Sequence, residues 1–212
     1  MGDWTLAAID SVGTILSASI FISAGILLWY RYRKKSIETT EHLSKFFISF
    51  GVYQLIYGFP VLLIGGSGFN GAFEIFSHIF FFLSLGYLSV FALALTRSGW
   101  RTIFFVSNII IGGLSMFLFF QTWTVIYPLS GFLALVNFVG LGTLPFFRLS
   151  LDKDDYERGK LIVSGIGFFV LWASGLIQAY SSTATEYIAA DAISVLGAIL
   201  ILVGVHFKKL FK

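Results

Sequence analysis

The chain of 212 residues contains no cysteine. Disulfides, thiolate metal ligands, cysteine nucleophiles and cysteine-bound iron–sulfur clusters are therefore excluded. Histidine is also scarce, and His42, His78 and His206 are far apart in the sequence. A zinc site needs clustered histidine and acidic ligands, so we expect no metal centre and no cofactor. A haem held by His42 and His206, both predicted near one membrane face, is the alternative left open.

Charged residues are also scarce. Only 12% of the residues are charged, whereas soluble proteins carry roughly a quarter. Hydrophobic residues make up 57%, with 25 phenylalanines among them. This is more apolar surface than one water-facing globule buries, so we expect the lipid bilayer to cover the rest. The net charge of +3 then reflects the loops, and no nucleic-acid partner is implied.

Seven apolar stretches are long enough to cross a bilayer core of about 30 Å, which takes about 20 residues of helix. We predict transmembrane spans at about residues 7–30, 46–64, 72–95, 103–120, 125–147, 161–180 and 187–207. The connecting segments are too short to hold a soluble domain. We therefore expect a single domain, an all-α integral membrane bundle of seven helices.

Positive charge is missing from one side of this predicted topology. All 14 Lys and Arg residues fall after the first, third, fifth and seventh spans. Because such residues collect in cytoplasmic segments, we predict an N-terminus outside and a C-terminus in the cytoplasm. A missed or invented span would scatter the charges over both sides, so the pattern supports the count. We expect a multi-pass protein of the plasma membrane or an equivalent cytoplasmic membrane.

The predicted outer side carries acidic residues without cations to pair with them: Asp3, Asp10, Glu74, Glu186 and Asp191. Glu74 and His78 are four residues apart and share a helix face, and Gln178 is expected at similar depth. We interpret Asp10, Glu74, His78, Gln178 and Asp191 as an outer polar cluster that attracts cations or amine-bearing ligands. The alternative is that the acids are solvated among lipid headgroups and that His78 only packs between helices.

Neutral polar side chains lie deeper in the predicted spans. Gln54, Tyr57, Asn137 and Trp172 are the main ones, and two readings of them stay open. They bridge helices by hydrogen bonds, which contribute about 0.6 kcal/mol each in membrane proteins, or they line a central ligand pocket.

Small residues within the spans are expected at close helix contacts. They are Ser19, Ser23, Gly112, Gly113, Gly140, Gly142, Gly165, Gly197 and Gly204. Pro145 falls in the last turn of the fifth predicted span, where we interpret it as marking the end of the helix.

Several functions can be argued against. A retinal Schiff base needs a mid-span lysine, and every lysine here is predicted at or beyond a cytoplasmic span end. No nucleophile with a base and an orienting acid is recognisable, so we expect a protein that is not an enzyme.

Three functions remain. The outside N-terminus, the basic first loop and the arginine-bearing turn at 95–101 resemble the seven-helix membrane regions of bacterial sensor proteins. That resemblance implies a receptor-like bundle that binds a small molecule or ion and acts through a protein partner at its cytoplasmic face, because only about five residues follow the last span. The alternatives are a small transporter or channel for a cation or small solute, and an accessory subunit of a larger membrane complex.

Overall fold

The structure is a computed structural model, and it describes residues 3–36, 38–64, 70–96, 99–119, 131–181 and 183–206. Every regular element in these residues is helical. The elements are α1 (Asp3–Lys35), α2 (Glu38–Ile64), α3 (Asn70–Leu95), α4 (Arg101–Phe119), the π-helix η2 (Leu135–Thr143), α6 (Leu144–Ser150), α7 (Asp155–Tyr180) and α8 (Ala184–His206). The predicted all-α class is confirmed for the described part of the chain.

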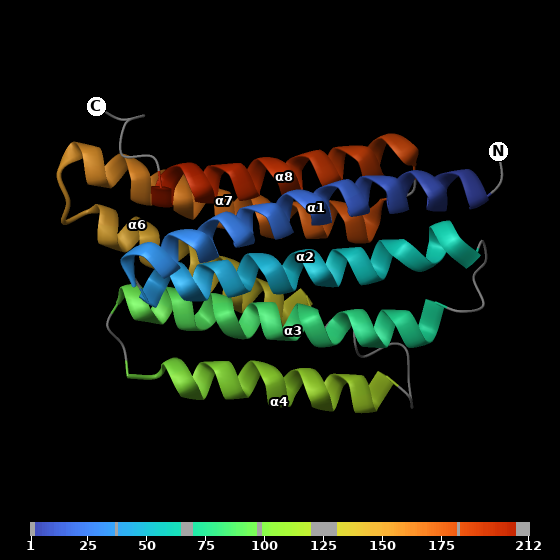
Figure 1. Ribbon diagram of the computed structural model, residues 1–212, viewed down its shortest axis with the longest axis horizontal. Coiled ribbons are helices and arrows are strands. Elements are labelled where there is room, and N and C mark those ends of the chain that lie inside the picture. Colours follow the sequence, from blue (N-terminus) through green and yellow to red (C-terminus); the bar gives the residue numbers. More distant parts are fainter. Residues whose placement is uncertain are drawn as a thin grey trace.

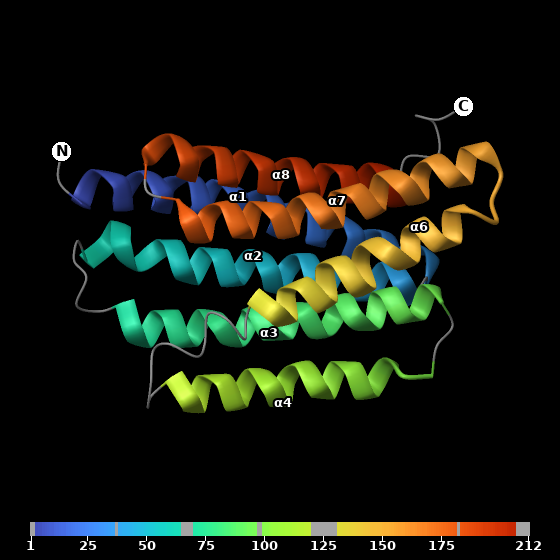
Figure 2. The same cartoon turned by 180° about the vertical axis from the view of Figure 1, so that it is seen from behind.

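The helices form a ring with one helix outside it. Going round the ring, α1 packs on α2, α2 on α3, α3 on η2, η2 and α6 on α7, α7 on α8, and α8 on α1. Helix α4 packs chiefly on α3 and lies at the edge of the bundle (Figure 1). The same arrangement seen from behind shows η2 and α6 crossing α3 toward α7 (Figure 2). The first, second and last helices therefore surround one side of an interior that η2, α6 and α7 close from the other.

Five segments are long and apolar enough to cross a membrane: Ser11–Lys34, Phe76–Leu95, Gly131–Ser150, Glu157–Tyr180 and Thr185–Val205. They correspond to the predicted spans at 7–30, 72–95, 125–147, 161–180 and 187–207. The other two predicted spans also form helices, α2 and α4. In α4 the stretch whose side chains the structure describes, Arg101–Leu114, is apolar but shorter than a span, and the described part of α2 includes two acids, a lysine and Gln54. Five such helices indicate a multi-pass membrane protein.

Helix boundaries differ from the prediction where charged residues are concerned. The first basic loop was expected over residues 31–45, but α1 continues to Lys35 and α2 begins at Glu38. Between them Ser36 adopts a left-handed backbone with φ 51°, and its N–H donates to the Tyr32 carbonyl at 2.7 Å. Charged side chains are tolerated in these end turns because they extend toward water, so hydropathy alone underestimates the helix lengths.

One end of the bundle carries the positive charge. The connections α1–α2, α3–α4 and α6–α7 lie at the same end as the end of α8 (Figure 1). Within the described residues, every Lys and Arg lies in these connections or within about two turns of them: Arg31, Arg33, Lys34, Lys35, Lys45, Arg101, Arg148, Lys153, Arg158 and Lys160. We call this the basic end and the other the acidic end.

Phenylalanines fill the interior toward the basic end. Phe46 of α2, Phe91 of α3, Phe146 of α6 and Phe168 of α7 are all buried, and their ring centroids approach to 5.6–6.2 Å. Offset and edge contacts at such distances are favourable between aromatic rings. The interior of the ring is thus packed with apolar side chains in its basic half.

Glycine permits the closest helix contacts. A Cβ on Gly51 would lie 2.9 Å from the Ala18 carbonyl, and one on Gly167 would lie 2.8 Å from the Gly197 carbonyl. The prediction of close packing is confirmed at Gly112, Gly142, Gly165, Gly197 and Gly204. It is wrong for Gly113 and Gly140, where an added Cβ would meet no other described residue within 4 Å. It is also wrong for Ser19 and Ser23, which are exposed. Composition alone cannot tell which face of a helix meets a neighbour.

Pro145 is not at the end of its helix. The helix continues to Ser150, and the π-helix η2 directly precedes the proline. Proline lacks an N–H and crowds the preceding turn. The wider turn accommodates it, since the Leu144 N–H bonds to the Val139 carbonyl five residues back. The Thr143 hydroxyl lies 3.0 Å from the Phe138 carbonyl and 3.2 Å from the Gly165 carbonyl of α7.

Candidate functional site

Asp191 is the acidic residue that the structure places inside the bundle. It lies two turns into α8 and is only 8% exposed. Its carboxyl packs against the backbone of Gly13 on α1, where a Cβ would come within 2.0 Å of Oδ2. Only glycine at position 13 leaves room for this carboxyl. A buried carboxyl in a membrane-spanning segment is energetically costly and is often functional.

Small polar side chains of α1 are also buried in this half of the bundle. Ser11, Thr14 and Ser17 are each at most 2% exposed. The Ser17 hydroxyl donates to Gln54 Oε1 of α2 at 3.2 Å. Among the described residues, Thr14 Oγ1 is buried without a hydrogen-bond partner.

His78 of α3 is the second buried titratable group in the acidic half. It is 6% exposed, and its ring lies edge-on to Tyr53 of α2 with centroids 6.1 Å apart. The rings of Phe81 and Phe82 flank it at 6.2 Å. The imidazole is therefore enclosed by aromatic side chains between α2 and α3.

The remaining members of the predicted outer polar cluster lie elsewhere or outside the described side chains. The side chains of Asp10 and Glu74 are outside the described part of the structure, although both residues belong to helices, α1 and α3. Gln178 is partly exposed near the end of α7. Glu186, by contrast, caps α8: its carboxylate accepts from the Thr183 N–H at 2.9 Å, and its own N–H donates to Thr183 Oγ1 at 3.3 Å. This reciprocal capping gives Glu186 a local structural role.

The residues predicted to line a central pocket have separate partners. Gln54 bonds to α1, while Asn137 of η2 exchanges hydrogen bonds with Asn108 of α4. Trp172 packs beside Phe169 on α7, with centroids 5.6 Å apart, and Tyr57 is 39% exposed next to Tyr53. Phe138, adjacent to Asn137, packs on Phe50 of α2. The bridging contacts of Gln54 and Asn137 fit the reading in which they hold helices together.

Ionic contacts at the basic end tie the starts of α2 and α4 together. The Glu38 carboxylate accepts from Arg101 at 2.8 Å and lies 3.6 Å from His42 Nε2. The hydrogen bond from the Lys45 ammonium lowers the pKa of the Glu41 carboxyl. Burial lowers the pKa of the His42 imidazole, against the attraction of Glu41 and Glu38. This network keeps the charges of the basic end in fixed positions.

A grouping of three or more acidic or histidine ligands suited to a metal ion is not found among the described residues. Asp191 of α8 contributes a carboxyl, and Thr14 and Ser17 contribute hydroxyls on α1. Such oxygens suit hard monovalent cations and protonated amines better than transition metals.

Comparison of the chain with family models, curated proteins and solved structures returned no match. The functional argument therefore depends on the geometry of the buried polar groups.

Sequence reasoning missed Gly13, Thr14 and Asn108. One signal was present: Ser11, Thr14 and Ser17 are three residues apart and follow one face of a helix. Gly13 and Asn108 gave no comparable signal, because their importance comes from partners on α8 and η2.

Proposed function

We propose that this protein is a receptor-like, non-enzymatic membrane bundle that binds a small cation or an amine-bearing molecule in its acidic half and acts through a protein partner at its basic end. The observation that carries the proposal is the Asp191 carboxyl buried against Gly13. A carboxylate removed from water attracts positive charge strongly, because little solvent screens it. The buried Thr14 hydroxyl supplies a second oxygen on α1 in the same half.

Packing favours binding over transport. A transport path needs a polar route through both halves of the bundle, but buried phenylalanines of α2, α3, α6 and α7 occupy the basic half. The transporter reading requires these rings to move apart. An accessory subunit is the third candidate, for which the exposed apolar side chains of α4 supply a surface.

The proposal includes seven spans, with α2 and α4 crossing the membrane, the N-terminus outside and the C-terminus in the cytoplasm. The start of α1 and the end of α8 lie at opposite ends of the bundle (Figure 1). This supports an odd number of crossings, since η2 runs directly into α6 and the two count as one helix. Because the chain has no cysteine, a single introduced thiol reports its side without background. We expect Ser36→Cys and Lys153→Cys to react with an impermeant maleimide only from the cytoplasmic side, and Ser181→Cys only from outside. Reaction of Ser36→Cys and Ser181→Cys from the same side would contradict the topology.

Ligand binding is tested by thermal stability of the purified protein with sodium, potassium and a series of primary amines. A ligand that binds only the folded state raises Tm, by an amount that grows with the logarithm of its concentration relative to Kd. We expect at least one probe to raise Tm of the unmodified protein and to lose this effect in Asp191→Asn. Glu186→Gln is the matched control on the same helix, because glutamine keeps the capping hydrogen bonds. Stabilisation that is equal in Asp191→Asn and the unmodified protein would contradict the site.

Measuring uptake into proteoliposomes distinguishes a receptor from a transporter. Proteoliposomes are loaded without the stabilising probe, and its uptake is followed with and without the protein. A receptor binds the probe with no protein-dependent uptake, whereas uptake abolished by Asp191→Asn would favour the transporter.

A further inference from the structure

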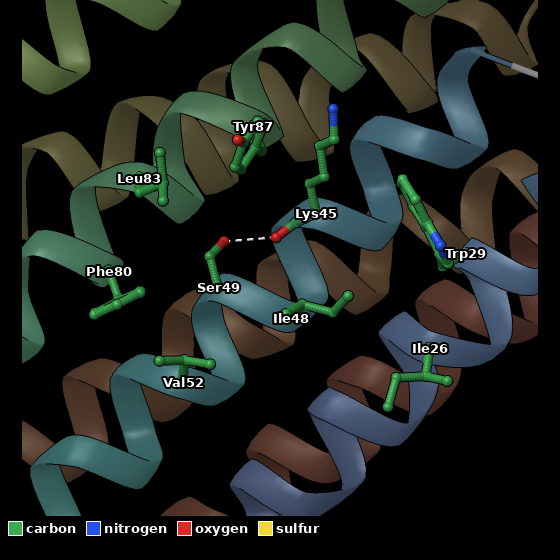
Figure 3. A pocket seen from close by; sticks show the side chains of 9 residues that line it. All are labelled: Ile26, Trp29, Lys45, Ile48, Ser49, Val52, Phe80, Leu83 and Tyr87. Atoms are coloured by element: carbon green, nitrogen blue, oxygen red, sulfur yellow. Dashed lines mark hydrogen bonds between the residues drawn. The ribbon is translucent and has the colours of Figure 1, made fainter.

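A furrow of about 380 Å³ runs along the outer surface of α2 near the basic end, between α1 and α3 (Figure 3). Helices α1 and α3 both pack on α2, which forms the floor. The apolar part of its lining comes from Ile26 of α1, Ile48 and Val52 of α2, and Phe80 and Leu83 of α3. Two of these three helices contain membrane-span segments, Ser11–Lys34 and Phe76–Leu95. The furrow thus opens on the side of the bundle that faces lipid acyl chains.

The hydroxyl in the middle of the furrow, that of Ser49, already donates a hydrogen bond within its own helix. Ser49 Oγ donates to the Lys45 carbonyl of its own helix at 2.6 Å (Figure 3). It offers no remaining hydrogen to an occupant, so the stretch from Ser49 to Val52 behaves as an apolar wall. A hydrocarbon chain suits the mainly apolar lining of this part.

The end of the furrow nearest the basic end is different in character. Trp29, Lys45 and Tyr87 close it, and the Lys45 ammonium lies 5.7 Å from the centroid of the Tyr87 ring. The Arg33 guanidinium lies 5.8 Å from the Trp29 ring. Tryptophan and tyrosine at such positions mark the headgroup level of a bilayer. The apolar furrow therefore ends in aromatic rings and cations at the depth of lipid phosphates.

The charge at this end selects an anionic headgroup. Lys45 is paired with Glu41, but an ammonium has three donors and the carboxylate occupies one direction. Arg33 adds a second positive charge beside Trp29. Basic positions between helices at the cytoplasmic side of a membrane attract anionic lipids. The net charge of Lys45, Arg33 and Glu41 together is positive.

We propose that this furrow holds one acyl chain of an anionic phospholipid, whose phosphate lies against Lys45 and Arg33. The lipid would lie across α1, α2 and α3 and thereby bridge α1 and α3 over the outer surface of α2. The site lies in the opposite half of the bundle from Asp191, so it stands independently of the proposed cation site.

The test uses tryptophan fluorescence at the furrow. Trp4, Trp100, Trp123 and Trp172 are replaced by phenylalanine, which leaves Trp29 as the only tryptophan. The protein is reconstituted in phosphatidylcholine vesicles, and quenching by acyl-brominated phosphatidylglycerol is compared with quenching by brominated phosphatidylcholine. We expect phosphatidylglycerol to be preferred about five-fold, the factor that corresponds to one lysine at a membrane surface.

Two pairs of variants separate a specific site from general attraction to anionic lipid. Lys45→Gln is expected to reduce the preference toward one, while Lys34→Gln, which removes an equal charge from above Tyr30, retains it. Val52→Phe fills the furrow and is expected to reduce quenching by both lipids. Val106→Phe on the exposed face of α4 should leave it unchanged. Equal losses in Lys45→Gln and Lys34→Gln, or no preference at all, would overturn the proposal.

A second measurement avoids the tryptophan replacements. Native mass spectrometry of the otherwise unmodified chain, released from mixed phosphatidylglycerol and phosphatidylcholine, counts bound lipids. We expect a retained phosphatidylglycerol in the unmodified protein and in Lys34→Gln, and its loss in Lys45→Gln. Retention in all three proteins contradicts the assigned headgroup position.

Discussion

Asn108 of α4 and Asn137 of η2 hydrogen-bond to each other through their side-chain amides. Asn108 Nδ2 donates to Asn137 Oδ1 at 3.2 Å, and Asn137 Nδ2 donates to Asn108 Oδ1 at 2.8 Å. Each Nδ2 also donates to a carbonyl one turn back in its own helix, Phe104 and Leu133 respectively. Both side chains are thereby satisfied in a buried position. Because α4 otherwise packs chiefly on α3, this pair connects the peripheral helix to a second element of the ring, η2.

Replacing both members of the amide pair is expected to cost less stability than the sum of the two single substitutions. Asn137→Leu leaves the Asn108 amide buried with only its local bond, which costs about 1–2 kcal/mol. Asn108→Leu has the converse effect. The double variant removes both polar groups, so its loss should be smaller than the sum of the single losses. Chemical denaturation of all four proteins in one detergent measures this coupling, and strict additivity would contradict the reciprocal bond.

Gly51 and Gly113 provide a pair of glycines with opposite expectations. A methyl group on Gly51 would meet the backbone of α1, with the Ala18 carbonyl at 2.9 Å and the Ile22 nitrogen at 3.0 Å. Gly51→Ala should therefore separate α1 from α2 and lower Tm. A Cβ on Gly113 would have no atom of another described residue within 4 Å, and alanine favours helix by about 1 kcal/mol over glycine. Gly113→Ala should leave Tm unchanged or raise it, as thermal denaturation in detergent will show.

Phe168 and Phe169 are neighbours in the sequence with different surroundings. Phe168 is fully buried against Phe146 and Phe91, whereas Phe169 is 45% exposed. Truncation of a buried phenylalanine leaves a cavity, so Phe168→Ala should lower Tm by at least about 5 °C. Phe169→Ala faces the surrounding lipid or detergent and should change Tm by less than about 2 °C. Similar losses in the two variants would contradict the assigned core.

The lowered pKa of His42 predicts that the protein loses stability in mild acid. Burial lowers the pKa of its imidazole below the ordinary value of 6.5. The unfolded chain therefore binds a proton more readily than the folded chain. The contribution to stability is complete above about pH 6.5 and is lost as the pH falls through the lower folded-state pKa.

The measurement is Tm between pH 8 and pH 5 for the unmodified protein and for His42→Gln. Tm of the unmodified protein should fall as the pH is lowered over this interval, and Tm of the variant should fall less. Glu41 has a lowered pKa because of Lys45, so its contribution is lost only below its ordinary value of 4.5. The two effects are therefore separated on the pH axis, and parallel curves above pH 5 would contradict the role of His42.

Much of the architecture was predictable from composition and periodicity. Long apolar stretches must form helices in lipid, because every backbone polar group needs a partner there. The five segments that are long and apolar enough to cross a membrane each match a predicted span. The grouping of Lys and Arg at one end of the bundle followed from their alternation between connecting segments. Errors arose at helix ends, where charged residues continue the helices, and at Pro145, where a π-helix accommodates the proline.

The site was less predictable. The sequence pointed to Asp191 among five acids, but not to its burial against Gly13. It left Asn137 open as a bridge between helices or a pocket residue, and the structure pairs that side chain with Asn108 on a peripheral helix. A linear pattern indicates depth in the membrane, since depth follows position along a helix. It does not indicate which rotation each helix adopts about its own axis.

The sequence by itself determined that the chain is helical, that lipid must cover much of it, and that its Lys and Arg residues lie at one end, because these properties depend on residue types and spacing alone. The tertiary structure decided which polar groups meet. Helix rotation is fixed by the packing of glycines and phenylalanines contributed by different helices, and that packing places Asp191 beside Gly13, joins Asn108 to Asn137, and leaves an apolar furrow ending at Lys45.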